Sequence, residues 1–218
     1  MALPAEQIND IIEEYDLGRM VGYLLKNNPS FAAPYHSHAH CLRTTYLAKK
    51  AWDYSNKVQC PVDLLIAALW HDFGHFQGFY TNDYNNVVQA EFGFRRFHEV
   101  YNSSSIYFPR TKYDPDTISR LILGSVYPPH QEALNSCRSV FVRYLLDADY
   151  GWWHTNTMWQ NLCGIKQEYF RHIEWQEYLE KSIEFFKGLK FYTPFGQEIV
   201  SPELNLVIKE TQRILDFI

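Results

Sequence analysis

The feature that most constrains the fold is an apolar run, VDLLIAALW, at residues 62–70. Pro61 precedes it, and proline is favoured at the first position of a helix, so we expect a helix to begin there. A helix that is apolar on all sides is not stable at a surface and is buried among other elements. This segment therefore predicts a bundle in which other helices surround a central one.

Helical spacing and helix-end signals recur along the rest of the chain, whereas alternating strand patterns are almost absent. We expect helices over residues 5–27, 36–57, 61–74, 87–101, 114–126, 136–150 and 165–187, and from 201 to the C-terminus. The only segment with a plausible hairpin pattern is FYTPFGQEIV, residues 191–200. The connections between these predicted helices are of a length that fits one helical domain. A chain of 218 residues can also bury a large core. The predicted architecture is a single all-α domain spanning residues 1–218.

Composition and charge narrow the classes of function. A net charge of −5 and a pI near 6.0 argue against binding of duplex nucleic acid, which requires a cationic face. No stretch approaches the ~18 apolar residues that cross a membrane, and the N-terminus has no signal-peptide pattern. The cysteines, Cys41, Cys60, Cys137 and Cys163, are far apart, which indicates reduced thiols. We therefore expect a cytoplasmic protein without membrane attachment. The aromatic fraction of 17% would permit a homodimer through exposed rings.

Histidines are concentrated in two short segments, PYHSHAH at residues 34–40 and WHDFGH at residues 70–75. Residues four apart share a helix face, so His36 lies with His40 and His71 lies with His75. Asp72 is beside them at the end of the apolar run, where a buried carboxylate without a partner is costly. Neutral imidazole and carboxylate groups are ligands for divalent cations. The two segments therefore predict a metal site.

A third segment, LLDADYG at residues 145–151, also places carboxylates at the end of an apolar helix. Only one of Asp147 and Asp149 need face the histidines, and the spacing alone leaves both open. His130, which follows a break at Pro128 and Pro129, is a further candidate. A single residue of this kind is usually a packing or surface residue. The three segments together, in an all-helical chain, favour one shared cation.

These segments resemble the motifs of the HD superfamily of metal-dependent phosphohydrolases. The sequence YHSHAH, residues 35–40, is similar to the Y-H-N-x-x-H segment of cyclic-nucleotide phosphodiesterases and of bacterial predicted HD phosphohydrolases, with Ser37 in place of the asparagine. HDFGH, residues 71–75, resembles the H-D-x-x-H that follows it, and LLDADYG resembles L-D-A-D-L-x-x-L-G. The resemblance covers residues 34–152, about half of the chain, and implies an HD-domain helical bundle.

The resemblance also implies roles for individual residues. The implied ligands of a first metal ion are His40, His71, Asp72 and Asp149, with Asp147 as the alternative to Asp149. His36 matches the histidine that protonates the leaving group, and Asp72 could also orient the attacking water. His75 and His130 match positions that reach a second metal ion or a substrate phosphate. The register of the motif favours Asp149 as the fourth ligand.

The implied reaction is hydrolysis of a nucleotide or another small phosphate ester by water that a divalent cation activates. The identity of the cation is open among Mn, Mg, Co, Ni, Fe and Zn. Arginines close to the motifs, Arg43, Arg95 and Arg96, are candidates for binding the substrate phosphate.

Three other interpretations stay open. Some HD-fold proteins hold two irons and cleave C–C or C–P bonds with dioxygen, and His75 with His130 would supply the extra ligands. A second interpretation is an HD module that binds a nucleotide without catalysis. A third is a structural zinc site, which the sequence disfavours because such sites usually include several cysteines and only Cys41 lies near the histidines.

Overall fold

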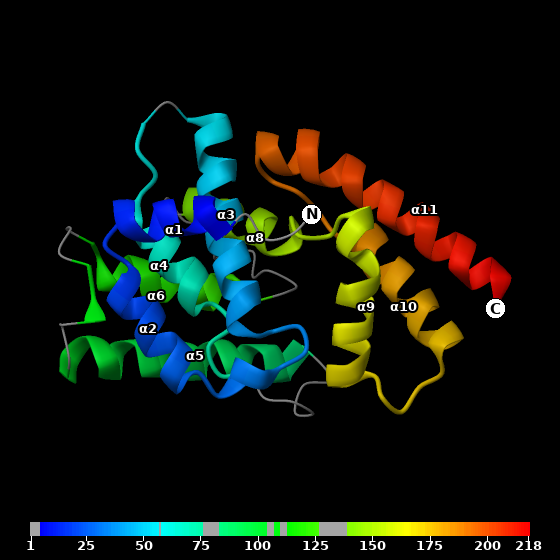
Figure 1. The fold of residues 1–218 in the computed structure, drawn as a ribbon, viewed down its shortest axis with the longest axis horizontal. Helices are drawn as coiled ribbons and strands as arrows, with labels where there is room; N and C mark the ends of the chain where they lie inside the picture. The colour runs from blue at the N-terminus through cyan, green and yellow to red at the C-terminus, as the bar shows by residue number, and fades with distance from the viewer. Residues whose placement is uncertain (1–4, 57, 76–82, 104–106, 110–112, 127–138) are drawn as a thin grey trace.

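The computed structural model describes residues 5–56, 58–75, 83–103, 107–109, 113–126 and 139–218. Within these ranges the regular structure is entirely helical, with no strand, which confirms the predicted all-α class (Figure 1). The α-helices are α1 (Ala5–Glu14), α2 (Gly18–Asn27), α3 (His38–Ser55), α4 (Val62–Trp70), α5 (Asp83–Ser103), α6 (Pro115–Gly124), α8 (Ser139–Tyr150), α9 (Thr155–Tyr169), α10 (Trp175–Gly188) and α11 (Ser201–Phe217). Short helical turns cover Pro29–Ala32 and Gly196–Val200.

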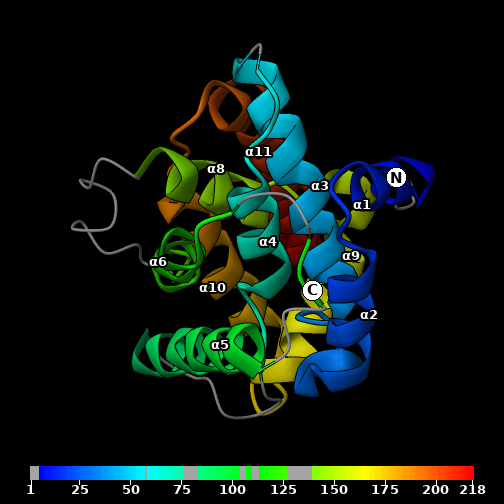
Figure 2. The same ribbon diagram turned by 90° about the vertical axis from the view of Figure 1, so that its left-hand side faces the viewer.

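The apolar helix α4 lies in the centre of the first part of the chain, as its sequence predicts. All of its residues except Asp63 are buried. Helices α3, α6 and α8 pack against it, and Figure 2 shows them arranged around α4. The end of α4, together with His71 and Asp72 directly after it, is therefore held inside the bundle.

Two predicted helices are each divided in two. Residues 5–27 form α1 and α2 because Asp16 adopts a left-handed backbone conformation, with a φ of 53°, which no α-helix continues through. Residues 165–187 were predicted as one helix, but α9 begins earlier and ends at Tyr169, and α10 begins at Trp175. Between them, Lys166 Nζ donates to the carbonyls of Phe170 and Ile173, at 3.1 and 2.6 Å, and so contacts the segment that connects the two helices.

The predicted hairpin at residues 191–200 is wrong, because the structure has a helical turn there. The backbone N–H groups of Tyr192 and Thr193 donate to the carboxylate of Asp147 on α8, and so does the Thr193 hydroxyl. Gly196 packs so closely on this carboxylate that a Cβ atom would overlap it. The donors that a strand would offer to a neighbouring strand are therefore used by one buried side chain.

A second core belongs to the last three helices. It includes the buried residues Trp153, Met158, Leu162, Tyr178, Leu179, Phe186, Leu204 and Val207. In Figure 1, α9, α10 and α11 lie together on one side of the molecule, from yellow to red. The single domain over residues 1–218 stays a prediction. No helix among the described residues is both long enough and apolar enough to cross a membrane.

Candidate metal centre

Side chains from three separate segments of the chain meet at one point. His40 lies near the start of α3, His71 and Asp72 follow α4 directly, and Asp149 lies at the end of α8. One ligand atom of each residue lies within 4.8 Å of the corresponding atoms of the other three. The two histidines and Asp72 are buried, and Asp149 is partly buried. This group could hold a metal ion.

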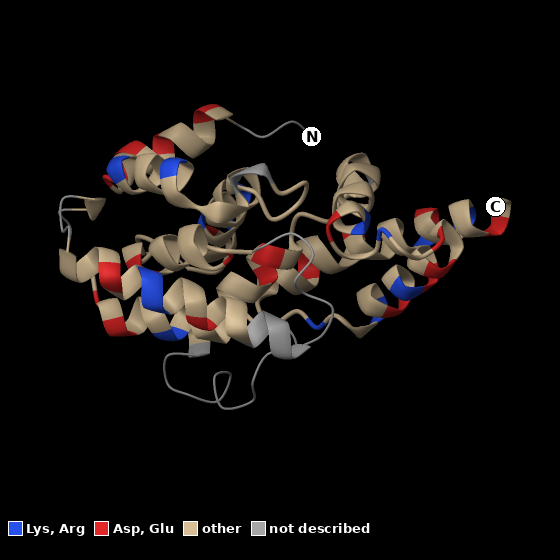
Figure 3. Cartoon of the chain, turned by 90° about the horizontal axis from the view of Figure 1, so that it is seen from below, with Lys and Arg blue, Asp and Glu red and all other residues tan. Residues whose placement is uncertain are grey.

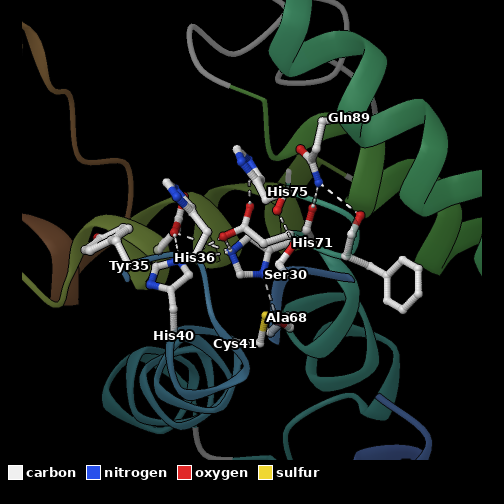
Figure 4. A network of polar contacts seen from close by, with 12 residues as sticks. Ser30, Tyr35, His36, His40, Cys41, Ala68, His71, His75 and Gln89 are labelled. Atoms are coloured by element: carbon white, nitrogen blue, oxygen red, sulfur yellow. Dashed lines mark hydrogen bonds and ion pairs between the residues drawn. The ribbon is translucent and has the colours of Figure 1, made fainter. Parts of the chain in front are cut away.

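The distances within the group are short. The Nε2 atoms of His40 and His71 are 3.3 Å apart, and Asp72 Oδ2 lies 3.1 Å from each of them. Asp149 Oδ1 lies 2.9 Å from Nε2 of His40 and 3.4 Å from Nε2 of His71. Figure 4 shows His40 and His71 approaching each other from α3 and from the end of α4.

The chemistry of these atoms fits a divalent cation. His71 Nδ1 lies 2.8 Å from the carbonyl oxygen of Ala68, and because a carbonyl only accepts, Nδ1 carries the hydrogen. In the neutral imidazole the lone pair is then on Nε2, which faces the rest of the group. Imidazole nitrogens and carboxylate oxygens packed this closely repel one another unless a proton or a cation lies between them. Two nitrogen and two oxygen ligands suit manganese, iron, cobalt, nickel or zinc.

The pKa values of the group depend on one another. Burial lowers the pKa of His71, but Asp72 and Asp149 raise it by more, to well above its usual range. Burial also lowers the pKa of His40, but Asp149 and Asp72 raise it by more. Burial raises the pKa values of Asp72 and Asp149, but the histidines lower them by more, so both lie below their usual range. Without a cation, protons on the imidazoles balance the carboxylates.

Metal binding should therefore release protons and become tighter as the pH rises. A protonated imidazole is not a ligand, and the raised pKa values of His40 and His71 extend this competition above the usual histidine range. We expect the affinity for Mn²⁺ to fall about tenfold per pH unit for each proton displaced, between about pH 8 and about pH 6. Calorimetry in two buffers with different ionisation enthalpies measures the protons released. An affinity that does not change over this range would contradict the prediction.

The turn that carries His71 and Asp72 is fixed by Asn28 and Ser30, which sequence reasoning missed. Asn28 Oδ1 accepts hydrogen bonds from the backbone N–H groups of Ser30 and Gly74, each at 3.1 Å. The Ser30 hydroxyl donates to the carbonyl of His75. Gly74 has a φ of 85°, and a Cβ there would overlap the ring of Phe92. Asn28 is separated from this turn by 46 residues, and no local motif indicates the contact.

Gln89 on α5 supports the same turn from another side. Its Nε2 donates to the carbonyls of His71 and Phe73, at 3.2 and 3.3 Å (Figure 4). These acceptors follow the end of α4, where helix carbonyls lack partners within the helix. The orientation of the histidine and aspartate side chains is thus set by backbone contacts with α2, the turn after it and α5.

Two further histidines lie beside the group as a stacked pair. The ring centroids of His36 and His75 are 4.2 Å apart, and the ring planes differ by 7°. His75 Nε2 lies 3.5 Å from Asp72 Oδ1, so the pair adjoins the candidate ligands. Burial, and then the neighbouring His36, lower the pKa of His75 to about 3, so this ring is neutral.

Glu168 and Tyr169, at the end of α9, contact this pair. Glu168 Oε2 lies 2.5 Å from His36 Nδ1, and Oε1 accepts the backbone N–H of His36 at 2.9 Å and that of Tyr35. The Tyr169 hydroxyl lies 2.6 Å from His75 Nδ1 and 3.1 Å from His36 Nδ1. Burial raises the pKa of Glu168, but the contacts with His36 lower it by more. Sequence reasoning missed both residues, since they belong to no motif.

Asp147 lies apart from the candidate metal group, although it is two residues from Asp149. It is fully buried, and its carboxylate accepts hydrogen bonds from Tyr192 and Thr193. Burial raises the pKa of Asp147 to about 6, against the lowering effect of these hydrogen bonds. Its contacts are those of a residue that anchors the segment before α11. His130 lies outside the described residues.

The candidate phosphate-binding arginines lie in different surroundings. Arg43 is partly buried, and its guanidinium lies 4.8 Å from the ring centroid of Trp152. Arg95 and Arg96 pair with glutamates of their own helix, at 3.2 and 2.8 Å. Their side chains are 71% and 41% exposed, which is typical of a solvated helix surface. A phosphate-binding role stays a prediction for all three.

A comparison of the chain with protein-family models found no match, and comparisons with curated proteins and with solved structures found no significant similarity. A function for the chain is therefore inferred from its residues and their geometry.

Proposed function

We propose that this chain is a metal-dependent phosphohydrolase of the HD type that acts on a nucleotide or another small phosphate ester. The observation that carries the proposal is the convergence of His40, His71, Asp72 and Asp149 within 4.8 Å. These are the residues that the motif resemblance implies as ligands. The stacked histidine pair beside the group supports a reactive centre, since a purely structural ion needs no such neighbours.

When bound, a divalent cation would supply Lewis-acid activation of water and of a phosphoryl oxygen. The chain itself would supply proton transfer. His36 donates its Nδ1–H to Glu168, so Nε2 is the ring nitrogen available to a substrate. The side chain of His36 is 16% exposed and that of Glu168 is 2% exposed, so the histidine alone of the two is accessible. A histidine held in this way can exchange a proton with the leaving oxygen.

Charge supports a small substrate in preference to a duplex. The net charge is −5, and in Figure 3 the Lys and Arg positions are scattered among acidic ones. Arg43 follows His40 by one helical turn, and its buried Nε makes no hydrogen bond with the described residues. A guanidinium in this state is suited to an anionic group of modest size.

The test is elemental analysis of the purified protein, followed by a phosphate-release screen with added Mn, Co, Mg or Ni. The screen covers nucleoside mono- and triphosphates, cyclic nucleotides and small phosphate esters. We expect one substrate class to be hydrolysed, and His71→Ala to lose both the ion and the activity. Hydrolysis by metal-depleted protein would contradict the proposal. Bound iron together with oxygen consumption would instead favour the oxygenase, and nucleotide binding without hydrolysis would favour a module without catalysis.

A further inference from the structure

The end of α9 brings one hydroxyl group to both rings of the stacked pair. The Tyr169 oxygen lies 2.6 Å from His75 Nδ1 and 3.1 Å from His36 Nδ1. Figure 4 shows the two histidines next to each other, close to His71. A single side chain from the C-terminal helices therefore contacts both histidines that adjoin the candidate metal ligands.

The contacts determine where the ring hydrogens lie. His36 Nδ1 faces a carboxylate oxygen of Glu168 at 2.5 Å, so this nitrogen carries a hydrogen. The stronger contact of the Tyr169 hydroxyl is then the one to His75 Nδ1. If the hydroxyl donates to that nitrogen, the hydrogen of the neutral His75 ring is on Nε2. Nε2 is the atom that lies 3.5 Å from Asp72 Oδ1, so an N–H group then faces a carboxylate.

We propose that Tyr169 is a positioning residue, whose hydroxyl holds His75 in the Nε2–H form so that His75 supports the carboxylate of Asp72. Metal-binding carboxylates are commonly held by outer polar groups, and losing one typically costs about 10- to 100-fold in metal affinity or activity. The role in catalysis rests on the proposed function, but the hydrogen arrangement does not. The arrangement also assigns His75 to the support of Asp72 and not to a second ion.

The direct test uses protein with ¹⁵N-labelled histidine and no added metal. Long-range ¹H–¹⁵N spectra at about pH 8, where an ordinary imidazole is neutral, distinguish a ring nitrogen that carries hydrogen from one that does not. His75→Gln and His36→Gln assign the signals. We expect His75 in the Nε2–H form and His36 in the Nδ1–H form. In Tyr169→Phe, the two His75 nitrogens should move toward an average of both forms.

The second measurement is the affinity for Mn²⁺, which we expect to be weaker in Tyr169→Phe, by less than the about 10- to 100-fold typical of losing the outer group itself, because part of the His75 rings keep the Nε2–H form. Tyr178→Phe is the control, because Tyr178 is buried and its hydroxyl donates to the carbonyl of Leu162 on α9 at 2.8 Å. This control removes a comparable hydrogen bond away from the histidines. It should leave both the His75 signals and the Mn²⁺ affinity as in the parent protein.

Three outcomes would overturn the inference: an Nδ1–H form of His75 in the parent protein, unchanged His75 signals in Tyr169→Phe, or the same changes in Tyr178→Phe. The spectra need neither bound metal nor substrate. A protein that shows the expected signals but hydrolyses no phosphate ester would therefore contradict the proposed function and leave this inference supported.

Discussion

Asp149→Asn should abolish metal binding and phosphate release while the protein stays folded. Asp147→Asn should instead lower the stability of the fold and leave metal binding unchanged. The two substitutions are chemically identical and lie two residues apart. Asp149 Oδ1 faces both histidines of the candidate group, and an amide is a poor substitute for a carboxylate ligand. We expect a loss of at least about 100-fold in activity from this change.

Asp147→Asn places an NH₂ group against donors. Oδ1 of Asp147 accepts from the backbone N–H of Tyr192, and Oδ2 accepts from that N–H and from the N–H and hydroxyl of Thr193, so an NH₂ group in place of either oxygen meets at least one backbone N–H. We expect the free energy of unfolding to fall by about 1–3 kcal/mol, with metal content unchanged. Elemental analysis, phosphate release and urea unfolding separate the two effects. If Asp147→Asn lost the ion and Asp149→Asn kept it, the assignment of the fourth ligand would be reversed.

His36→Ala should lower turnover by about 100- to 10,000-fold and leave metal content near normal, which is the second large effect. The side chain of His36 contacts Glu168, Tyr169 and His75, but its atoms are not part of the candidate metal group. Glu168→Gln should act in the same direction with a smaller loss, because the amide no longer supplies a charged acceptor for Nδ1–H. Loss of the ion in His36→Ala would make His36 a ligand.

A matched control for Glu168→Gln is Glu177→Gln on α10. The side chain of Glu177 is 53% exposed and pairs with Lys181 at 3.6 Å, so its neutralisation should leave turnover unchanged. Comparison of kcat at saturating substrate for the two variants shows whether the buried glutamate acts on the reaction. Equal activities in both variants would exclude a role for Glu168 in orienting His36.

The parts of the site that lie next to strong local patterns were predictable. His71 and Asp72 follow a helix whose burial is evident from its composition. The expected helical spacing of His36 with His40, and of His71 with His75, is wrong, because α3 begins at His38 and α4 ends at Trp70. The sequence placed Asp147 and Asp149 near the site but could not by itself separate them. The separation depends on donors at residues 192–193, and that segment carries no motif and was predicted as a hairpin.

The parts that were missed depend on contacts between distant residues. Glu168 contacts His36 across 132 positions of the chain, and Tyr169 contacts His75 across 94. Both residues lie at the end of α9, where the sequence predicts a continuous helix over 165–187 and therefore no helix end. Asn28 reaches Gly74 from the end of α2, and nothing in the sequence around it indicates this contact. Periodicity describes which face of a helix is buried, but not which polar groups meet across the interior.

The position of Glu168 and Tyr169 at the end of α9 determines when they are synthesised relative to the candidate ligands. All four candidate ligands have left the ribosome once residue 149 has emerged, because the other three precede it in the chain. Glu168 and Tyr169 come later, on a helix that shares a core with α10 and α11, which are synthesised after it. The residues that could hold an ion are therefore synthesised before the two residues that contact His36 and His75.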